Sequence, residues 1–286
     1  MFMKESINEI LDFSNVRSRD MIKLIATDMD NSLLGEGYIL DESFFDIFEK
    51  LKEKNIKLLA ASGRQGASMM ETFKHEKDNI IFVYENGSCA SLNGEVLYKS
   101  VIDNEIVQEF IRIGRENNLD ILLGAKDTAY IESRNPAFID KASNFFANLE
   151  IVDDLTKVDD EIIKCNVCDL DGIWDHFHNI IEPNFGDKLQ LATSMGFWIH
   201  LVNKGITKGY AVKMIQEKLG IKGSEMMTFG DDDGDIEMIE LADEYAFAME
   251  NARDEIKVHA KHIAPAYNKN GVLETIKKII IDGETL

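Results

Sequence analysis

The stretch LIATDMDNSLL, residues 24–34, places Asp28 and Asp30 directly after a run of apolar and small residues. A buried strand avoids unpaired carboxylates, because burying them is costly. A solvated loop does not need such an apolar approach. The pattern therefore predicts a buried strand that presents two carboxylates at its carboxyl end, which is where open α/β sheets bind ligands.

Apolar strands and amphipathic helices alternate on both sides of the middle of the chain. The early strands are expected in KLIATD, IKLLAAS and NIIFVYENG, and Asn93-Gly94 between two short β-like runs indicates a hairpin. The alternation resumes with the helix KGYAVKMIQEKLG and continues through EMMTFGD and EYAFAM. This order predicts an α/β fold with a doubly wound, Rossmann-like parallel sheet.

The middle of the chain has a different pattern. Residues 100–187 contain two adjacent expected strands before a helix, which indicates a smaller, partly antiparallel α+β unit. We therefore expect a core domain formed by residues 21–99 and 188–286, interrupted by residues 100–187 as a cap domain. Residues 1–20 precede the first strand and are interpreted as an N-terminal extension.

The net charge of −21, from 52 acidic and 31 basic residues, limits the expected partners. Nucleic acids and anionic membranes favour clustered Lys and Arg, so neither is expected to bind. The N-terminal residues lack the apolar stretch of a signal peptide, and no apolar run approaches the ~20 residues of a membrane span. We expect a cytoplasmic protein. The sequence does not indicate its oligomeric state.

A single C-x-x-C is formed by Cys165 and Cys168, with His176 and His178 shortly after. The segment IIKCNVCD is typical of a strand, in which residues three apart point to opposite faces. The spacing between the cysteines and the histidines matches no common zinc pattern. A structural role is therefore favoured over a metal or redox site.

Polar side chains gather where the predicted core elements end or begin. Besides Asp28 and Asp30, Ser62 ends the second strand, Lys208 begins a helix, and Asp231–Asp235 follow the strand MMTFG. The carboxyl ends of parallel strands meet at one edge of a sheet, so these groups are expected to lie in one crevice. Oxygen ligands of this kind suit Mg²⁺ together with a substrate phosphate.

The chain resembles the haloacid dehalogenase superfamily, specifically its Cof-like phosphatase branch. The resemblance covers nearly all of residues 21–286 and rests on four motifs in the order of the family. These are DMDNS for D-x-D-G-[TS], the serine of ASGR, the lysine of GITKG, and GDDDGD for GD-x-x-ND. The resemblance implies a Mg²⁺-dependent phosphatase of small phosphorylated metabolites, such as sugar phosphates, with the cap closing over the site.

The resemblance also implies a role for each motif residue. Asp28 would be the nucleophile that forms an aspartyl phosphate, and Asp30 the general acid and base. Ser62 and the N–H of Gly63 would hold phosphoryl oxygens, and Lys208 would supply positive charge to the same group. The implied metal ligands come from Asp28, Asp30 (through its backbone carbonyl), Asp231 and Asp235.

Three further residues are candidate substrate contacts, namely Arg64, Asn86 and Arg134. Arg64 could contact the substrate phosphate or only cover the rim of the site, and the sequence favours neither. His200 in FWIHLV is interpreted as facing a strand neighbour rather than as a catalytic group.

Two positions depart from the family pattern. Asn31 stands where the family prefers Gly, and Gly234 stands where it prefers Asn. Asn tolerates positive φ better than other non-glycine residues, so the first change is mild. The second removes an amide that could bond the phosphate or the aspartates. A catalytically weak binding or regulatory protein is therefore one alternative. A phosphomutase of the same fold is another, although no motif indicates it.

Overall fold

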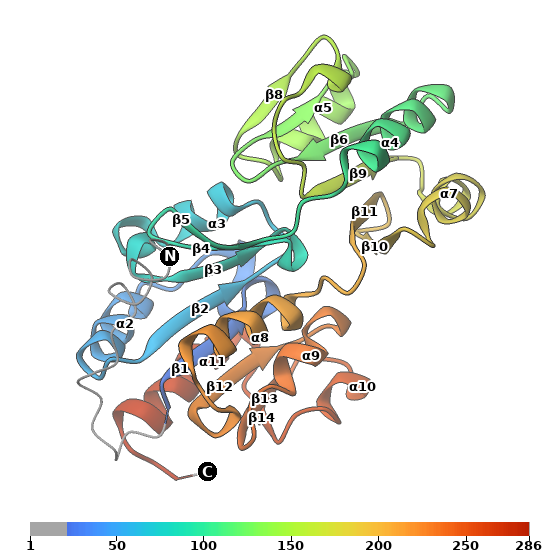
Figure 1. The fold of residues 1–286 in the computed structure, drawn as a ribbon. Coiled ribbons are helices and arrows are strands. Elements are labelled where there is room, and N and C mark those ends of the chain that lie inside the picture. Colours follow the sequence, from blue (N-terminus) through green and yellow to red (C-terminus); the bar gives the residue numbers. More distant parts are fainter. Residues whose placement is uncertain (1–21, 286) are drawn as a thin grey trace.

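The computed structural model describes residues 22–285, and the expected extension of residues 1–20 lies outside them. Two sheets are present (Figure 1). The first contains, in spatial order, β14 (His262–Ala264), β13 (Tyr245–Met249), β12 (Met226–Gly230), β1 (Leu24–Asp28), β2 (Lys57–Ala61), β3 (Ile81–Tyr84), β4 (Cys89–Leu92) and β5 (Glu95–Lys99). The second contains β10 (Leu189–Ser194), β11 (Trp198–Asn203), β9 (Lys164–Cys168), β6 (Asp120–Gly124), β7 (Ala129–Ile131) and β8 (Leu149–Ile151).

The first sheet confirms the predicted doubly wound α/β core. Neighbouring strands from β14 to β3 run parallel, and β4 and β5 add an antiparallel edge. Strand β1 lies between β12 and β2, so the order of the strands reverses at β1. Ligands of doubly wound sheets bind at such a reversal, outside the carboxyl ends of the strands. Asp28 is the last residue of β1 and therefore lies at this place.

Helices cover both faces of the first sheet (Figure 1). Ile25 packs in the same cluster as Phe48, whereas Leu24 and Ala26 pack with Val212 on the opposite face. Since both faces of β1 are buried, the strand carries no charged side chain until its last residue, and its one hydroxyl, that of Thr27, is bonded to the Asp28 carbonyl. One face is covered by α2 (Ser43–Glu53), α3 (Gly66–Thr72) and α11 (Gly271–Ile276), and the other by α8 (Lys208–Leu219), α9 (Ile236–Ile239) and α10 (Asp254–Lys257).

The second sheet belongs to the predicted smaller α+β unit. Its neighbouring strands are antiparallel, except that β7 and β8 run parallel. Cys165 and Cys168 pack in different clusters, so they face opposite sides of β9 as predicted, and both are free thiols. The helices of this unit are α4 (Asn104–Glu116), α5 (Pro136–Ser143), α6 (Trp174–His176) and α7 (Glu182–Phe185). Within residues 22–285, no helix is both long and apolar enough to span a bilayer.

The return of the chain to the core lies later than predicted. Strand β11 pairs with both β10 and β9, so both β10 and β11 belong to the second sheet. The prediction that the core resumes at residue 188 is therefore wrong for these two strands. We propose that the inserted unit spans residues 100–203. The pattern of each strand defines which side chains are buried but not which sheet the strand joins.

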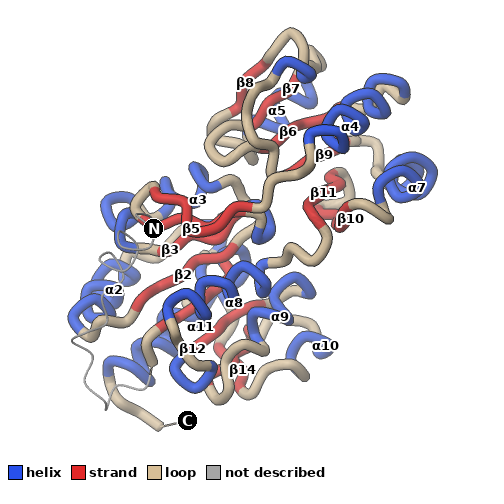
Figure 2. The backbone as a smooth tube through the Cα atoms, viewed as in Figure 1, coloured by secondary structure: helices blue, strands red, loops and turns tan. Residues whose placement is uncertain are grey.

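The two connections between the sheets run next to each other (Figure 2). The Asn203 side chain donates hydrogen bonds to Ser100 Oγ at 2.9 Å and to the Val101 carbonyl at 2.8 Å. The chain therefore leaves the first sheet and returns to it at one place.

Candidate active site

A carboxylate at the end of β1 and another from the segment that follows β12 meet at one ammonium group. Lys208 Nζ lies 2.7 Å from Asp28 Oδ1 and 2.9 Å from Asp235 Oδ1. Lys208 is the first residue of α8, where the Thr207 side chain caps the helix by accepting from the Tyr210 N–H. The structure thus brings Lys208 into contact with Asp28, 180 positions earlier in the sequence, and with Asp235, 27 positions later.

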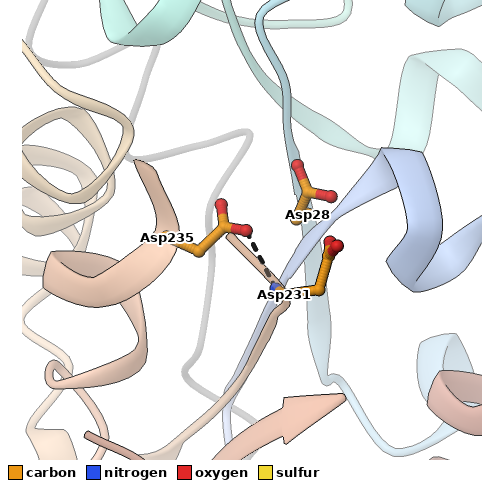
Figure 3. A group of neighbouring side chains, drawn as sticks. All are labelled: Asp28, Asp231 and Asp235. Carbon is orange, nitrogen blue, oxygen red and sulfur yellow. Dashed lines mark hydrogen bonds between the residues drawn. The ribbon is translucent and has the colours of Figure 1, made fainter. Parts of the chain in front are cut away.

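Asp231 completes a group of three carboxylates (Figure 3). Oxygen atoms of Asp28, Asp231 and Asp235 lie within 4.8 Å of one another. Asp235 Oδ2 accepts from the backbone N–H groups of Asp231 and Asp232 at 3.0 and 3.2 Å, and its other oxygen binds Lys208. Ser32 Oγ donates to Asp231 Oδ1 at 3.0 Å. Asp235 is therefore held by its own loop, whereas Asp28 and Asp231 each keep oxygen atoms for a ligand.

The electrostatics of this group favour a bound cation. Burial, reinforced by Asp235, raises the pKa of Asp28 well above its ordinary value, and Lys208 opposes this shift. Burial alone would lower the pKa of Lys208, but Asp235 and Asp28 outweigh it and raise that pKa well above 10.5. Burial and Asp235 together raise the pKa of Asp231 to about 7. Lys208 contacts two of the three carboxylates, those of the buried Asp28 and Asp235, while the partly buried Asp231 lies beside them. An all-oxygen donor set of this kind fits a hard divalent cation.

The raised pKa of Asp231 predicts how a cation and pH act together on stability. The carboxyl group holds its proton up to about 7 when folded, against 3.8 as its ordinary value. The metal-free protein should therefore lose stability as the pH rises between these values, because the folded state binds more protons than the unfolded state. Since a cation binds the deprotonated form, Mg²⁺ should raise the unfolding temperature more at about pH 8 than at about pH 5.5.

Thermal unfolding with Mg²⁺ and with EDTA at both pH values measures this difference. In Asp231→Asn the increment from Mg²⁺ should be smaller than in the wild-type protein at both pH values, because one of the carboxylate ligands is gone. An equal Mg²⁺ increment at the two pH values in the wild-type protein would contradict the prediction.

The loop after β2 lies beside Asp28. Asp28 is opposite Ala61 in the register of β1 and β2, so Ser62 is the next residue along this edge. Ser62 is buried, and its Oγ accepts from the Arg64 N–H at 3.2 Å. The Asn86 N–H donates to the Ser62 carbonyl at 3.3 Å. Residues 62–64 therefore begin at the edge of the sheet where Asp28 ends β1, and Asn86 is bonded to them. We call residues 62–64 the phosphate loop, after the role that the family resemblance predicts for Ser62 and Gly63.

The Asp30 side chain binds Arg64. Arg64 Nε and Nη2 lie 3.0 and 2.5 Å from the two oxygen atoms of Asp30. The Arg64 guanidinium also lies 5.3 Å from the centre of the Tyr38 ring. Both carboxylate oxygens of Asp30 are thus occupied by one side chain. The sequence left two roles open for Arg64, contact with the substrate phosphate or cover of the rim of the site. The structure shows a third arrangement, in which Arg64 pairs with Asp30, the second aspartate of DMDNS.

Asn31 adopts the left-handed conformation that the sequence predicts, with φ 60° and ψ 14°. Its carbonyl accepts from the Asn251 side chain at 3.0 Å. The other departure from the family pattern, Gly234, has an N–H that donates to Asp232 Oδ1 at 2.8 Å. Both residues therefore shape turns that carry motif aspartates.

The conformation of Asn31 leads to a matched pair of substitutions. Asn31→Gly should retain stability and activity to within about tenfold, because Gly adopts this conformation without penalty. Asn31→Val should be markedly worse, since a β-branched residue at positive φ is a genuine outlier. Urea unfolding and steady-state kinetics of both variants test this. A valine variant equal to wild type would contradict the role assigned to the turn.

Two sequence candidates lie apart from this cluster. Arg134 is exposed on the inserted unit and pairs with Asp153 at 2.9 Å, and no contact recorded within residues 22–285 joins it to Asp28. His200 bonds Ser194 Oγ at 2.7 Å and Asn166 Oδ1 at 2.8 Å. These partners lie on the two neighbouring strands, which confirms the interpretation of His200 as a strand contact.

Two buried charged residues beside the phosphate loop were not identified from the sequence. Glu85 follows β3, and Lys164 begins β9. Two sequence features could have pointed to these residues. Glu85 belongs to the short segment ENG at the end of an expected strand, and Lys164 is a lysine inside an otherwise apolar strand. A lysine in such a strand is rarely buried without a partner, and this could have suggested an ion pair.

Residues 25–276 match the family model of the haloacid dehalogenase-like hydrolases. The chain is 28% identical over 262 residues to the 5-amino-6-(5-phospho-D-ribitylamino)uracil phosphatase YbjI of Escherichia coli, covering 91% of this chain and 96% of that protein. It is 25% identical over 248 residues to the HMP-PP phosphatase of Klebsiella pneumoniae, covering 85% and 89%. A crystal structure from Eubacterium rectale has a TM-score of 0.83 and 29% identity, covering 91% of this chain and 100% of that one. These matches include both sheets.

Proposed function

Because the chain belongs to the haloacid dehalogenase-like hydrolases, we propose that it is a Mg²⁺-dependent phosphatase that hydrolyses small phosphorylated metabolites. The observation that carries the proposal is the contact of Lys208 with Asp28 and Asp235, beside Asp231, where the strand order reverses. This arrangement offers a nucleophile, a fixed positive charge and a place for a hard cation. The names of the two phosphatase relatives support the substrate class.

In the first step, an Asp28 oxygen attacks the phosphorus of the substrate. An oxygen–phosphorus bond forms at Asp28, the bond to the leaving oxygen breaks, and Asp30 gives that oxygen a proton. Lys208 orients Asp28 and neutralises charge on the phosphoryl group, while Ser62 and the Gly63 N–H hold its oxygens. Arg64 bonds each oxygen of Asp30 once, so the second lone pair of each oxygen is the site left for the transferred proton.

In the second step, water attacks the phosphorus of the aspartyl phosphate. Asp30 takes a proton from the water, and the bond between Asp28 and phosphorus breaks. Inorganic phosphate leaves, and Asp28 is restored as a carboxylate. The same carboxyl group therefore acts as acid and then as base.

Asp28, Asp231 and the backbone carbonyl of Asp30 would hold Mg²⁺, with Asp235 keeping their loop in place. When bound, Mg²⁺ offsets the negative charge of the phosphoryl oxygens and of the carboxylates around them. Phosphoryl transfer depends mainly on positioning and charge neutralisation, which is the chemistry that these side chains supply.

A screen for phosphate release tests this function. Sugar phosphates, nucleotides and phosphorylated cofactor precursors are offered with Mg²⁺, and each reaction is repeated with EDTA. We expect Mg²⁺-dependent release from at least one class. Intact Mg²⁺ binding without release from any class would favour a binding protein, and transfer of phosphate within a sugar without net release would favour a phosphomutase.

A further inference from the structure

Lys164 links the two sheets through a buried ion pair. Its Nζ lies 2.9 Å from Glu85 Oε2, and it donates a hydrogen bond to the Gly63 carbonyl at 3.1 Å. The side chains of Lys164 and Glu85 are 2% and 1% exposed. Lys164 belongs to the inserted unit, whereas Glu85 and Gly63 belong to the core. The Lys164 ammonium group therefore joins the inserted sheet to the phosphate loop, and Gln65, the residue after that loop, exchanges two further hydrogen bonds with the backbone of Asn148 in the inserted unit.

The turn that carries Glu85 also touches the rest of the site. Glu85 and Asn86 both have positive φ, 50° and 57°, a conformation that asparagine tolerates but that is costly for glutamate. The Glu85 N–H donates to the Arg64 carbonyl at 3.0 Å, and the Asn86 N–H donates to the Ser62 carbonyl. The backbone of this turn thus holds the phosphate loop from one side while the Glu85 side chain reaches the inserted sheet.

Gly87 fits the same turn against the helix that carries Lys208. Its φ is +94°, and a Cβ atom at this position would lie 2.1 Å from the Thr207 carbonyl oxygen. A side chain therefore cannot be added here. The turn at residues 85–87 is packed between the phosphate loop and the start of α8. A shift of this turn would therefore displace both of these segments.

Glu85 depends on Lys164 for its charge balance. Within residues 22–285, Lys164 is the one ion-pair partner recorded for Glu85, and Glu85 Oε1 has no hydrogen-bond partner. Removing one member of a buried ion pair leaves an uncompensated charge, which is strongly unfavourable. If the inserted sheet moves away, water must solvate Glu85, and the Gly63 carbonyl loses its donor.

We propose that Lys164 is a positioning residue that orders the phosphate loop when the inserted sheet lies against the core. It does so by holding the Gly63 carbonyl and the Glu85 turn together. This inference rests on the proposed function, because the loop is assigned to the phosphoryl group there. The phosphate loop then becomes ordered at the moment when the inserted unit closes onto the core.

A matched pair of lysine substitutions tests the proposal. Lys164→Met removes the buried link, whereas Lys99→Met removes a second ion pair between the units, with Glu161, which is more exposed. Two readouts are measured in the presence of Mg²⁺. One is the affinity for inorganic phosphate by calorimetry, and the other is amide hydrogen exchange of residues 62–66.

Lys164→Met should weaken phosphate binding by about tenfold or more and speed exchange in residues 62–66, because the loop loses an anchoring hydrogen bond. Lys99→Met should leave both within about twofold, since exposed ion pairs contribute little. Lys164→Arg, which keeps the charge and the donor, should recover part of the loss.

A double variant separates positioning from stability. Lys164→Met with Glu85→Leu removes both charges and should regain much of the stability lost in Lys164→Met. It should still bind phosphate weakly, because the Gly63 carbonyl remains without its donor. This variant also serves if Lys164→Met alone does not fold.

The outcomes distinguish this proposal from the proposed function. Wild-type affinity and wild-type exchange in Lys164→Met, or in the double variant, would overturn the positioning role alone. If the wild-type protein bound no phosphate with Mg²⁺, the proposed function would fail, and this inference would fail with it.

Discussion

Asp28→Asn is expected to abolish phosphate release, lowering kcat by about 10⁴-fold or more, as the loss of a catalytic nucleophile does elsewhere. The amide has nearly the shape of the carboxylate and can still accept from Lys208 Nζ, which lies 2.7 Å from Asp28 Oδ1. It cannot form the bond to phosphorus. Steady-state kinetics with p-nitrophenyl phosphate and Mg²⁺ measure the loss, and circular dichroism verifies that the variant is folded.

Asp233→Asn is the matched control, because Asp233 lies in the same acidic motif but is exposed and pairs with Arg253. We expect it to change kcat by less than about twofold, as for a typical surface substitution. The Asp28→Asn variant should also be at least as stable as wild type without metal at about pH 8, because it removes one of three crowded acids. More than about 1% of wild-type activity in Asp28→Asn would exclude Asp28 as nucleophile.

Lys208→Met is expected to have the second largest effect. It removes the ammonium group between Asp28 and Asp235, whose distances from Lys208 Nζ are 2.7 and 2.9 Å. We expect kcat/KM to fall by about 10³-fold, since a positioned charge at the phosphoryl group is lost. Breaking a buried ion pair from one side also destabilises by about 3–5 kcal/mol.

The destabilisation in Lys208→Met should depend on pH. Without the ammonium group the pKa values of Asp28 and Asp235, which burial already raises, rise further. The free energy of unfolding should therefore fall less at about pH 5, where protons replace the lost cation, than at about pH 8. Lys213→Met, an exposed change on the same helix, is the control for both measurements. A Lys208→Met variant that keeps a tenth of the activity would contradict the charge role.

Features set by a residue's own conformational preference could be predicted from the sequence. The Asn93-Gly94 turn joins β4 and β5 as a hairpin, with Leu92 opposite Glu95 and both turn residues at positive φ. Asn31 was expected at positive φ for the same reason and is found there. In each case the signal lies within a few residues, because the backbone angles of the turn are a property of those residues themselves.

Features set by distant partners could not be predicted in the same way. The strands Leu189–Ser194 and Trp198–Asn203 were correctly expected as strands, but their partner β9 is in the inserted unit. Lys164 is separated by 79 positions from Glu85, and neither residue's neighbours encode the pair. Periodicity specifies the buried face of a strand, whereas the choice of partner depends on the whole fold.

The two neighbouring connections that Asn203 bonds together have a consequence for how such a protein can evolve. Because the Asn203 side chain bonds to Ser100 and Val101, the two ends of the inserted unit are neighbours. The core therefore has to accommodate only two neighbouring chain ends, as it would for a surface turn. The entropic cost of closing a loop grows only slowly with its length, so an insertion of about a hundred residues adds little to it. Mutation and recombination can therefore replace the inserted unit while the aspartates and Lys208 stay in register. The protein can therefore acquire a new substrate when its inserted unit changes, while the reactive residues of the core stay the same.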